Sequence, residues 1–225
     1  MLSKRLAGLL AATLALSPML SLPLLTASAV ACADDSAPQA NPQVVVQTAI
    51  DALIARVSKD RKILQKSPTA LNNLVEQNIT PFVDIPGIAR GVMGQFYRQA
   101  SADQRDRFTN VLKQSMVNAY ATGLTSYNNQ KIVVKPYKPG DDMNRAQVDV
   151  EVTMDNGNVV PVTFQMVRDG NGAWKARNLL INGLNLGLTY RKRFAEVVEQ
   201  ASGNLDKAIS TWTPGQVDAN AKDKS

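Results

Sequence analysis

The chain has 225 residues, of which 44% are hydrophobic and 20% are charged, and this length allows one domain with a full hydrophobic core. It contains no histidine and one cysteine, which excludes Ser-His-Asp and Cys-His catalysis, most transition-metal sites and an internal disulfide. The formal net charge of +6 is too small to indicate nucleic acid as a partner, so we expect none.

Residues 1–33 have the pattern of an export signal peptide. Lys4 and Arg5 precede an apolar, uncharged run over residues 6–25, and small residues follow it. Ala31-Cys32-Ala33 satisfies the cleavage pattern of such signals. A membrane anchor is the alternative, because the apolar run approaches the ~20 residues that span a bilayer. The small residues at the end of the run favour cleavage.

Cys32 allows a second interpretation, which stays open. The sequence Ala-Val-Ala-Cys over residues 29–32 resembles a lipoprotein cleavage site, although Ala29 stands where such sites usually have leucine. With either interpretation the mature chain functions outside the cytoplasm. Loss of the two basic leader residues lowers the net charge from +6 to +4, which leaves the protein mildly basic.

Four start signals predict amphipathic helices after a polar linker over residues 34–40. The third helix is expected to continue through Phe96, with Gly87, Gly91 and Gly94 inside it. We attribute these glycines to close helix packing, and the alternative is a thin wall beside a cavity. The start signals are Asn41-Pro42, Ser67-Pro68, Asp84-Ile85-Pro86 and the capping box Ser101-Ala102-Asp103-Gln104.

The fourth helix is the clearest in the sequence, because apolar residues recur at helical spacing from Phe108 to Tyr127. Its length suits a helix that lies across a sheet. We therefore expect Leu112, Met116 and Tyr120 to contribute to a binding site between helix and sheet. Residues 130–137 follow as the first strand.

Residues 145–187 predict an antiparallel meander. Apolar residues alternate with polar ones, and the segments 155–157 and 169–172 have the Asn-Gly and Asp-Gly composition of tight turns. The alternation places an uncharged set on one face, which a helix or a ligand must cover. This set consists of Ala146, Val148, Val150, Val152, Met154, Val160, Val162, Phe164 and Met166.

The C-terminal region completes a single domain. Residues 188–201 predict a helix, Asn204 caps a short last helix, and residues 214–225 form a polar tail that we expect to be disordered. The sequence thus predicts one α+β domain over residues 34–213, in which a twisted antiparallel β-meander is covered by several amphipathic helices.

Catalytic signals are weak. Asp141 and Asp142 lie in a predicted turn, and Asp149 and Glu151 lie on the strand face opposite the valines, so solvent exposure explains both carboxylate pairs. The sequence lacks a phosphate-binding glycine loop, a nucleophile elbow and a cluster with metal-ligand spacing. We expect neither an enzyme nor a cofactor or metal site.

The predicted interior is suited to burying an apolar ligand. Each methylene removed from water contributes ~0.8 kcal/mol, so the two acyl chains of a diacyl lipid represent on the order of 20 kcal/mol before the cost of leaving a membrane is subtracted. Since the membrane is equally apolar, transfer is near balance, and a carrier can both load and unload. The head group would remain in water at the mouth of the cavity.

The ordered motifs of the mature chain resemble those of the MlaC-type periplasmic phospholipid-binding proteins, also called toluene-tolerance proteins. The residues that carry the resemblance are NAYATGLTSYNNQKIVV over 118–134, WKARNLLINGLNLGLTYRKRF over 174–194, Pro81-Phe82-Val83 and SADQRDRF over 101–108. No single motif is as specific as a metal signature, and the resemblance rests on their order along the whole mature chain.

The resemblance implies an NTF2-like α+β fold with an apolar cavity that holds phospholipid tails. It also implies a shuttle across the periplasm of a Gram-negative bacterium that maintains outer-membrane lipid asymmetry. Its partners would be an inner-membrane ABC transporter with an MCE-domain subunit and an outer-membrane lipoprotein–porin complex. Leu184 corresponds to the segment that borders the cavity mouth in this family, so it is the first expected lipid contact. The alternation adds Val148, Val150, Val152, Val162, Phe164 and Met166.

Two other functions stay open on the sequence alone. An adaptor would have helices that pack tightly on the sheet and leave no cavity. An enzyme on a hydrophobic substrate would need an acid or base that faces the interior, and the sequence offers neither histidine nor an inward carboxylate.

Overall fold

A computed structural model describes residues 41–64, 67–125 and 127–214, and for residues 61–63 and 120–125 it describes the backbone alone. The predicted signal peptide, the linker, Cys32 and nearly all of the C-terminal tail lie outside the described residues. In the described part, no helix combines the length and the apolar character that crossing a membrane requires.

The predicted start signals begin the helices because their side chains accept hydrogen bonds from the first free backbone N–H groups. Asn41 Oδ1 accepts from Gln43 N at 2.9 Å, and Ser67 Oγ accepts from Ala70 N at 3.2 Å. The capping box of the long helix forms in both directions. The helices are α1 (Pro42–Leu64), α2 (Pro68–Asn78), the 3-10 turn η1 (Thr80–Phe82), α3 (Ile85–Met93), α4 (Phe96–Gln99), α5 (Ala102–Thr125), α6 (Leu186–Gln200) and α7 (Leu205–Thr211).

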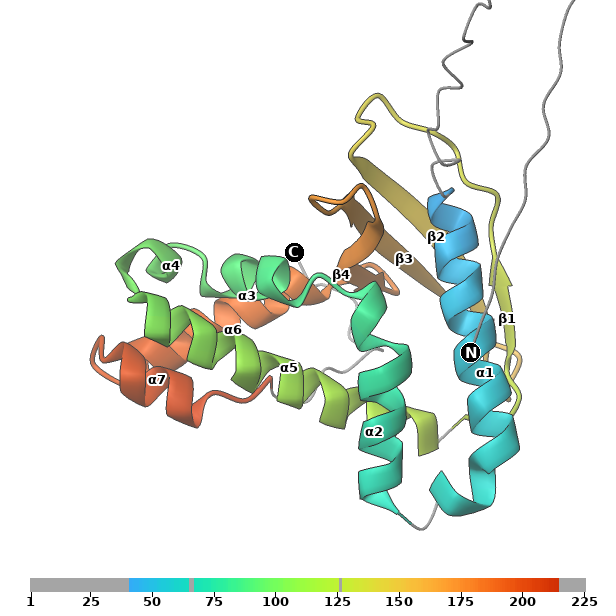
Figure 1. The fold of residues 1–225 in the computed structure, drawn as a ribbon, viewed down its shortest axis with the longest axis horizontal. Coiled ribbons are helices and arrows are strands. Elements are labelled where there is room, and N and C mark those ends of the chain that lie inside the picture. The colour runs from blue at the N-terminus through green and yellow to red at the C-terminus, as the bar shows by residue number, and fades with distance from the viewer. Residues whose placement is uncertain (1–40, 65–66, 126, 215–225) are drawn as a thin grey trace, which may run out of the picture. The chain divides into compact units, whose positions relative to one another are not determined.

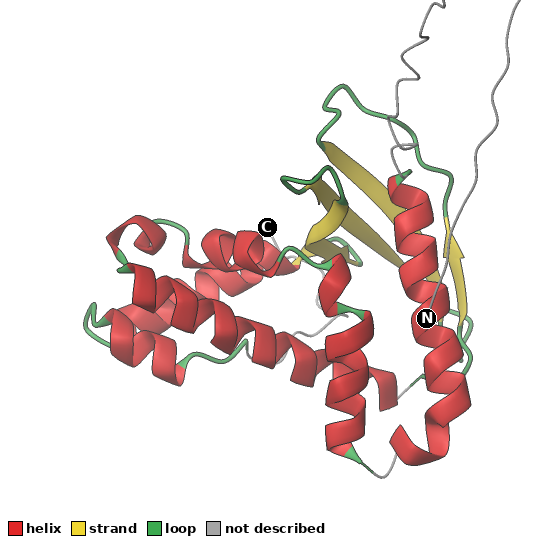
Figure 2. Ribbon diagram, viewed as in Figure 1, coloured by secondary structure: helices red, strands yellow, loops and turns green. Residues whose placement is uncertain are grey.

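The predicted meander is confirmed as a five-stranded antiparallel sheet in sequential order (Figure 2). Gly157 and Gly172 have φ angles of 81° and 79° in its turns, a conformation that favours glycine. A bulge interrupts the β3–β4 register, so Arg177 has no partner residue on β3. The strands are β1 (Lys131–Val134), β2 (Arg145–Thr153), β3 (Val159–Arg168), β4 (Trp174–Ile181) and β5 (Leu184–Asn185).

The helix that covers the face of β1 and β2 is α1, whereas the sequence suggested the long helix α5. Figure 1 shows α1 running along the face of β1, β2 and β3, and it contacts β1 and β2. Val46 of α1 is buried with Val148, Val150 and Met166 of the sheet. Met154, which the alternation placed inward, is exposed beyond the end of β2.

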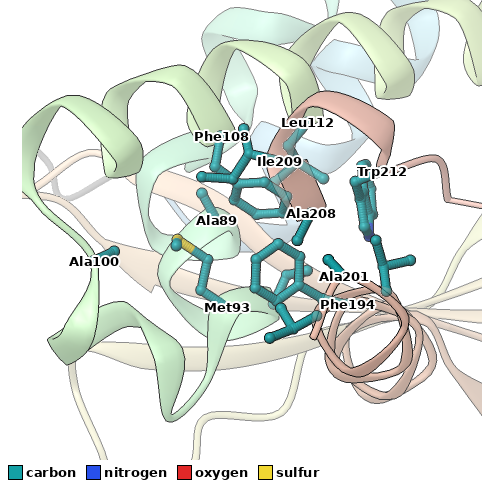
Figure 3. Close-up of a cluster of buried hydrophobic side chains, with 13 residues drawn as sticks. Ala89, Met93, Ala100, Phe108, Leu112, Phe194, Ala201, Ala208, Ile209 and Trp212 are labelled. Carbon is teal, nitrogen blue, oxygen red and sulfur yellow. The ribbon is translucent and has the colours of Figure 1, made fainter. Parts of the chain in front are cut away.

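The helix α5 instead belongs to a separate helical core. Its Phe108 and Leu112 are fully buried and pack with residues of α3, α6 and α7, as Figure 3 shows. The rings of Phe108 and Phe194 lie 4.6 Å apart, and the ring of Trp212 lies 5.3 Å from Phe108. Aromatic pairs at these distances stabilise a core beyond their buried area.

The expectation of a single third helix through Phe96 is wrong. The helix α3 ends at Met93 because Gly94 adopts a φ of 55°, and α4 follows as a separate short helix. A Cβ atom on Gly94 would lie 3.3 Å from Arg191 Cδ of α6, which supports the close-packing explanation for this glycine. The helix α6 begins at Leu186, two residues earlier than predicted, because Asn185 caps it through Leu188 N.

We expect Gly94→Ala to lower the free energy of unfolding by about 1–2 kcal/mol, because alanine resists the left-handed conformation. The control is Gly140→Ala, where an added Cβ meets no atom within 4 Å. This control should change stability by about 0.5 kcal/mol or less. Urea unfolding followed by circular dichroism measures both variants, and equal effects would contradict the role assigned to Gly94.

Candidate functional site

An apolar cavity of about 250 Å³ lies between the sheet, α1 and the helices α3, α5 and α6. The sheet contributes β3 and β4, α1 lies opposite them, and the first turn of α6 forms part of the wall. The lining residues are Val45, Val46, Ala49, Ile50, Leu53, Ile79, Phe82, Val83, Ile88, Met116, Ala119, Phe164, Met166, Ala176, Arg177, Asn178, Leu179, Leu186, Gly187 and Tyr190. None of these described lining residues carries a carboxylate.

Among the described lining residues, only Arg177 has a charged side chain, and an aspartate neutralises its charge. Its Nε donates to Asp84 Oδ2 at 2.6 Å, and its Nη2 forms an ion pair with the same oxygen. Asp84 also caps α3 by accepting from Gly87 N at 3.0 Å. A backbone hydrogen bond also joins the start of α3 to β4, because Asp84 N donates to the carbonyl of Ala176 at 2.9 Å. The guanidinium is therefore held at the rim of the cavity by the start of α3.

Asn178 holds the start of α6 against the sheet. Its Nδ2 donates to Gln165 Oε1 and to Asn185 Oδ1, both at 2.9 Å. Its Oδ1 accepts from Gly187 N at 2.9 Å, and a Cβ on Gly187 would lie 2.8 Å from this oxygen. Glycine is thus required at 187 for the close approach of the helix to β4. The amide of Asn178 is fully engaged within the protein.

Tyr190 is the third polar side chain of the lining. Burial raises the pKa of its phenol above the ordinary value, since the charged form loses its hydration there. Its ring packs edge-on against Trp212 at 6.2 Å. At neutral pH the group stays uncharged, so it serves as apolar wall rather than as a base.

A second, polar hollow of about 530 Å³ shares Met166, Arg177 and Asn178 with the cavity. It is also lined by Lys138 and Arg145 and by the carboxylates Asp141 and Asp142 of the loop before β2. Charged groups of both signs therefore lie beside the apolar cavity and outside it. In the described ranges, no group of three or more carboxylate or cysteine side chains could hold a metal ion.

The structure brings three of the predicted binding residues to the cavity: Met116, Phe164 and Met166. The other sheet residues, Val148, Val150, Val152 and Val162, belong to the cluster beneath α1 and do not line the cavity. Leu112 lies in the helical core. Leu184 is half-buried in β5 and pairs with Ile181, whereas Leu186 is the leucine of this segment in the lining. The side chain of Tyr120 lies outside the described residues.

Sequence reasoning missed the contribution of α1. Val45, Val46, Ala49, Ile50 and Leu53 of this helix line the cavity, and Val57 is buried. The signal was present in Val44-Val45-Val46, since three consecutive apolar residues give a helix more than one apolar side.

The geometry can retain an apolar molecule and offers no acid–base chemistry. Apolar side chains form the wall, and its polar groups already have partners within the protein or, for Tyr190, stay uncharged. These features define a protein that buries apolar ligands.

Comparison with known proteins specifies this class. Residues 47–213 match the model of the MlaC protein family, and the chain belongs to this family. It is 36% identical over 182 residues to the toluene tolerance protein ttg2D of Pseudomonas putida, which covers 80% of this chain and 83% of that protein. It is 27% identical over 150 residues to the intermembrane phospholipid transport system binding protein MlaC of Haemophilus influenzae, covering 66% and 70% of the two chains.

A solved structure has the same fold. The phospholipid-binding protein of Ralstonia solanacearum, determined in complex with a phospholipid, superimposes with a TM-score of 0.69 at 27% identity. The match covers 76% of this chain and 94% of that chain. The α+β fold with an open antiparallel sheet is therefore shared with a protein that holds a phospholipid.

Proposed function

We propose that this protein is a periplasmic phospholipid carrier, which holds acyl chains in the apolar cavity and leaves the head group outside. The observation that carries the proposal is a cavity whose wall is apolar, in which Arg177 and Asn178 are bonded within the protein and the phenol of Tyr190 is uncharged. A buried head group would find no unpaired charge among the described lining residues, whereas acyl chains need none. The mixed charges of the adjacent hollow suit a phosphate-bearing group at the mouth.

Loading requires the cavity to widen. Its volume of about 250 Å³ is below the roughly 300–1,000 Å³ of pockets for drug-sized ligands, and a diacyl lipid is larger still. We expect α1 to move, because its main contacts are limited to α2, β1 and β2. Movement of α1 would enlarge the cavity without disrupting the helical core.

The cellular part of the proposal extends the family membership. Residues 1–33 direct export, residues 34–213 form the carrier domain, and residues 214–225 are a polar tail. Cleavage before Asp34 releases the protein, and lipidation at Cys32 is the alternative outcome. The partners are an inner-membrane ABC transporter with an MCE-domain subunit and an outer-membrane lipoprotein–porin complex. Exchange between them maintains lipid asymmetry, and we propose no catalytic step or cofactor.

An adaptor function is the second candidate. It would require the helices to fill the inner face of the sheet, whereas side chains from α1, β3, β4 and α6 surround unfilled space. The cavity therefore favours the carrier over the adaptor.

Filling the cavity should block lipid uptake. Ala49→Trp places an indole among the lining residues, and we expect lipid-bound protein to fall about tenfold, equivalent to ~1.4 kcal/mol. Ala52→Trp, on the exposed side of the same helix, is the matched control and should load normally. Native mass spectrometry after incubation with phospholipid vesicles measures the bound fraction. Normal loading by Ala49→Trp would place the lipid elsewhere.

A charge introduced at Leu184 of β5 or at Leu186, the first residue of α6, should affect lipid retention differently. Leu186→Glu puts a carboxylate into the apolar lining, and we expect bound lipid to fall about tenfold or more because that charge must be desolvated. Leu184→Glu should retain more lipid, since Leu184 lies outside the lining. If Leu184→Glu loses more lipid than Leu186→Glu, the mouth lies at β5 instead.

A further inference from the structure

Three arginines contact Tyr97 or the end of α3, and a fourth, Arg98, follows Tyr97 in the chain. Arg90 lies in the last turn of α3, Arg98 lies on α4, and Arg105 is the fourth residue of α5. Arg191 extends from α6 to the end of α3. Arg90, Arg98 and Arg191 are exposed, and Arg105 is half-buried. We call this set the arginine cluster.

Tyr97 and the α3–α4 turn hold the guanidinium groups in place. Tyr97 has the guanidinium carbons of Arg90 and Arg105 at 5.5 and 4.5 Å from its ring centroid. Arg105 Nε also donates to the carbonyl of Tyr97 at 2.8 Å. Arginine stacked on an aromatic ring is pre-oriented, so it loses less freedom when it binds an anion.

Arg191 is fixed by the glycines of the same turn. Its Nε donates to the carbonyl of Gly91 at 2.7 Å. Its side chain passes so close to Gly94 that a Cβ there would lie 3.3 Å from Cδ. Both bonded arginines, Arg105 and Arg191, use Nε toward a backbone carbonyl and no carboxylate. Their terminal nitrogens remain available to a further acceptor.

The cluster lacks counter-charges among the described side chains. None of its four arginines forms an ion pair there, whereas Arg56, Arg107 and Arg177 each pair with an aspartate. Asp106 is the nearest carboxylate in sequence, but it adjoins Arg105 on the helix and so projects away from it. Four unneutralised arginines at one turn attract a negatively charged partner.

We propose that the arginine cluster is the docking surface for an acidic protein surface on a complex that delivers or receives lipid; this proposal rests on the carrier function. The cluster lies on helices that also wall the cavity, since Ile88 of α3 and Tyr190 of α6 line it. A partner bound there would contact the structure that holds the ligand. The planar guanidinium group of arginine binds a carboxylate through two parallel hydrogen bonds, so such contacts fix the orientation of the bound partner.

An acidic protein fits the cluster better than an anionic membrane. Surfaces that bind membranes combine basic residues with exposed apolar side chains that enter the lipid. Within α3 and α4, which the structure describes completely, no large hydrophobic side chain is exposed. Among the described side chains of α3, α4, α5 and α6, Leu188 is the one large hydrophobic residue that is exposed.

The test compares two double charge reversals in the full mature chain. Arg90→Glu/Arg98→Glu reverses two residues of the cluster that donate no hydrogen bond in the described part. Lys59→Glu/Lys131→Glu makes the same change in charge on exposed residues of α1 and β1. Affinity is measured separately for the immobilised MCE-domain subunit, for the lipoprotein–porin complex, and for vesicles of phosphatidylglycerol. Circular dichroism checks folding, and Arg90→Gln/Arg98→Gln replaces the first variant if it does not fold.

We expect Arg90→Glu/Arg98→Glu to bind at least one of the two protein complexes about tenfold more weakly, and the control to bind it within about twofold of the parent. Equal loss in both variants, or no loss in the first, would overturn the docking surface. A proportional loss of vesicle binding would instead identify a membrane-binding patch and also overturn it. Native mass spectrometry of each preparation separates the two proposals. If Arg90→Glu/Arg98→Glu retains phospholipid and binds both complexes as tightly as the parent, only the docking surface is refuted. If the parent itself carries no phospholipid, the carrier function is refuted.

Discussion

The attachment of the segment before α3 to strand β4 holds the helices and the sheet in one structure. Val83 forms a parallel bridge with Ala176, Asp84 pairs with Arg177, and Lys175 Nζ donates to the carbonyl of Pro81 at 2.6 Å. The bulge leaves Arg177 without a partner residue on β3, and its side chain points toward the start of α3. The position of α3 relative to the sheet, and with it the cavity between them, depends on these contacts.

The cavity exists because the buried hydrophobic residues that the structure describes form three separate clusters. One is the helical core around Phe108 and Phe194, one lies between α1 and the sheet, and one joins α1, α2 and α5. Each cluster is packed within itself, and residues at its border line the cavity: Ile88 from the first, Phe164 from the second and Leu53 from the third. Ligand burial can therefore change the space between the clusters while the helical core, which contains no residue of α1, keeps its packing.

Local sequence signals predicted the elements well, whereas the partners of each element required the structure. The caps Asn41, Ser67 and Asn204, and the turn glycines, act within a few residues, so their effects can be read from the sequence. Which helix covers the sheet depends on contacts far apart in sequence, and both α1 and α5 have apolar sides long enough for that role. For this reason Leu112 was expected at the binding site but lies in the helical core, and α1 was not expected there.

The most direct test of the carrier function is native mass spectrometry of the mature protein purified from the periplasm, followed by extraction and identification of bound lipid. If the protein is a carrier, adducts of phospholipid mass survive purification, and their masses give the number of acyl chains held. A ligand-free mass that stays unchanged after incubation with phospholipid vesicles would contradict the carrier function.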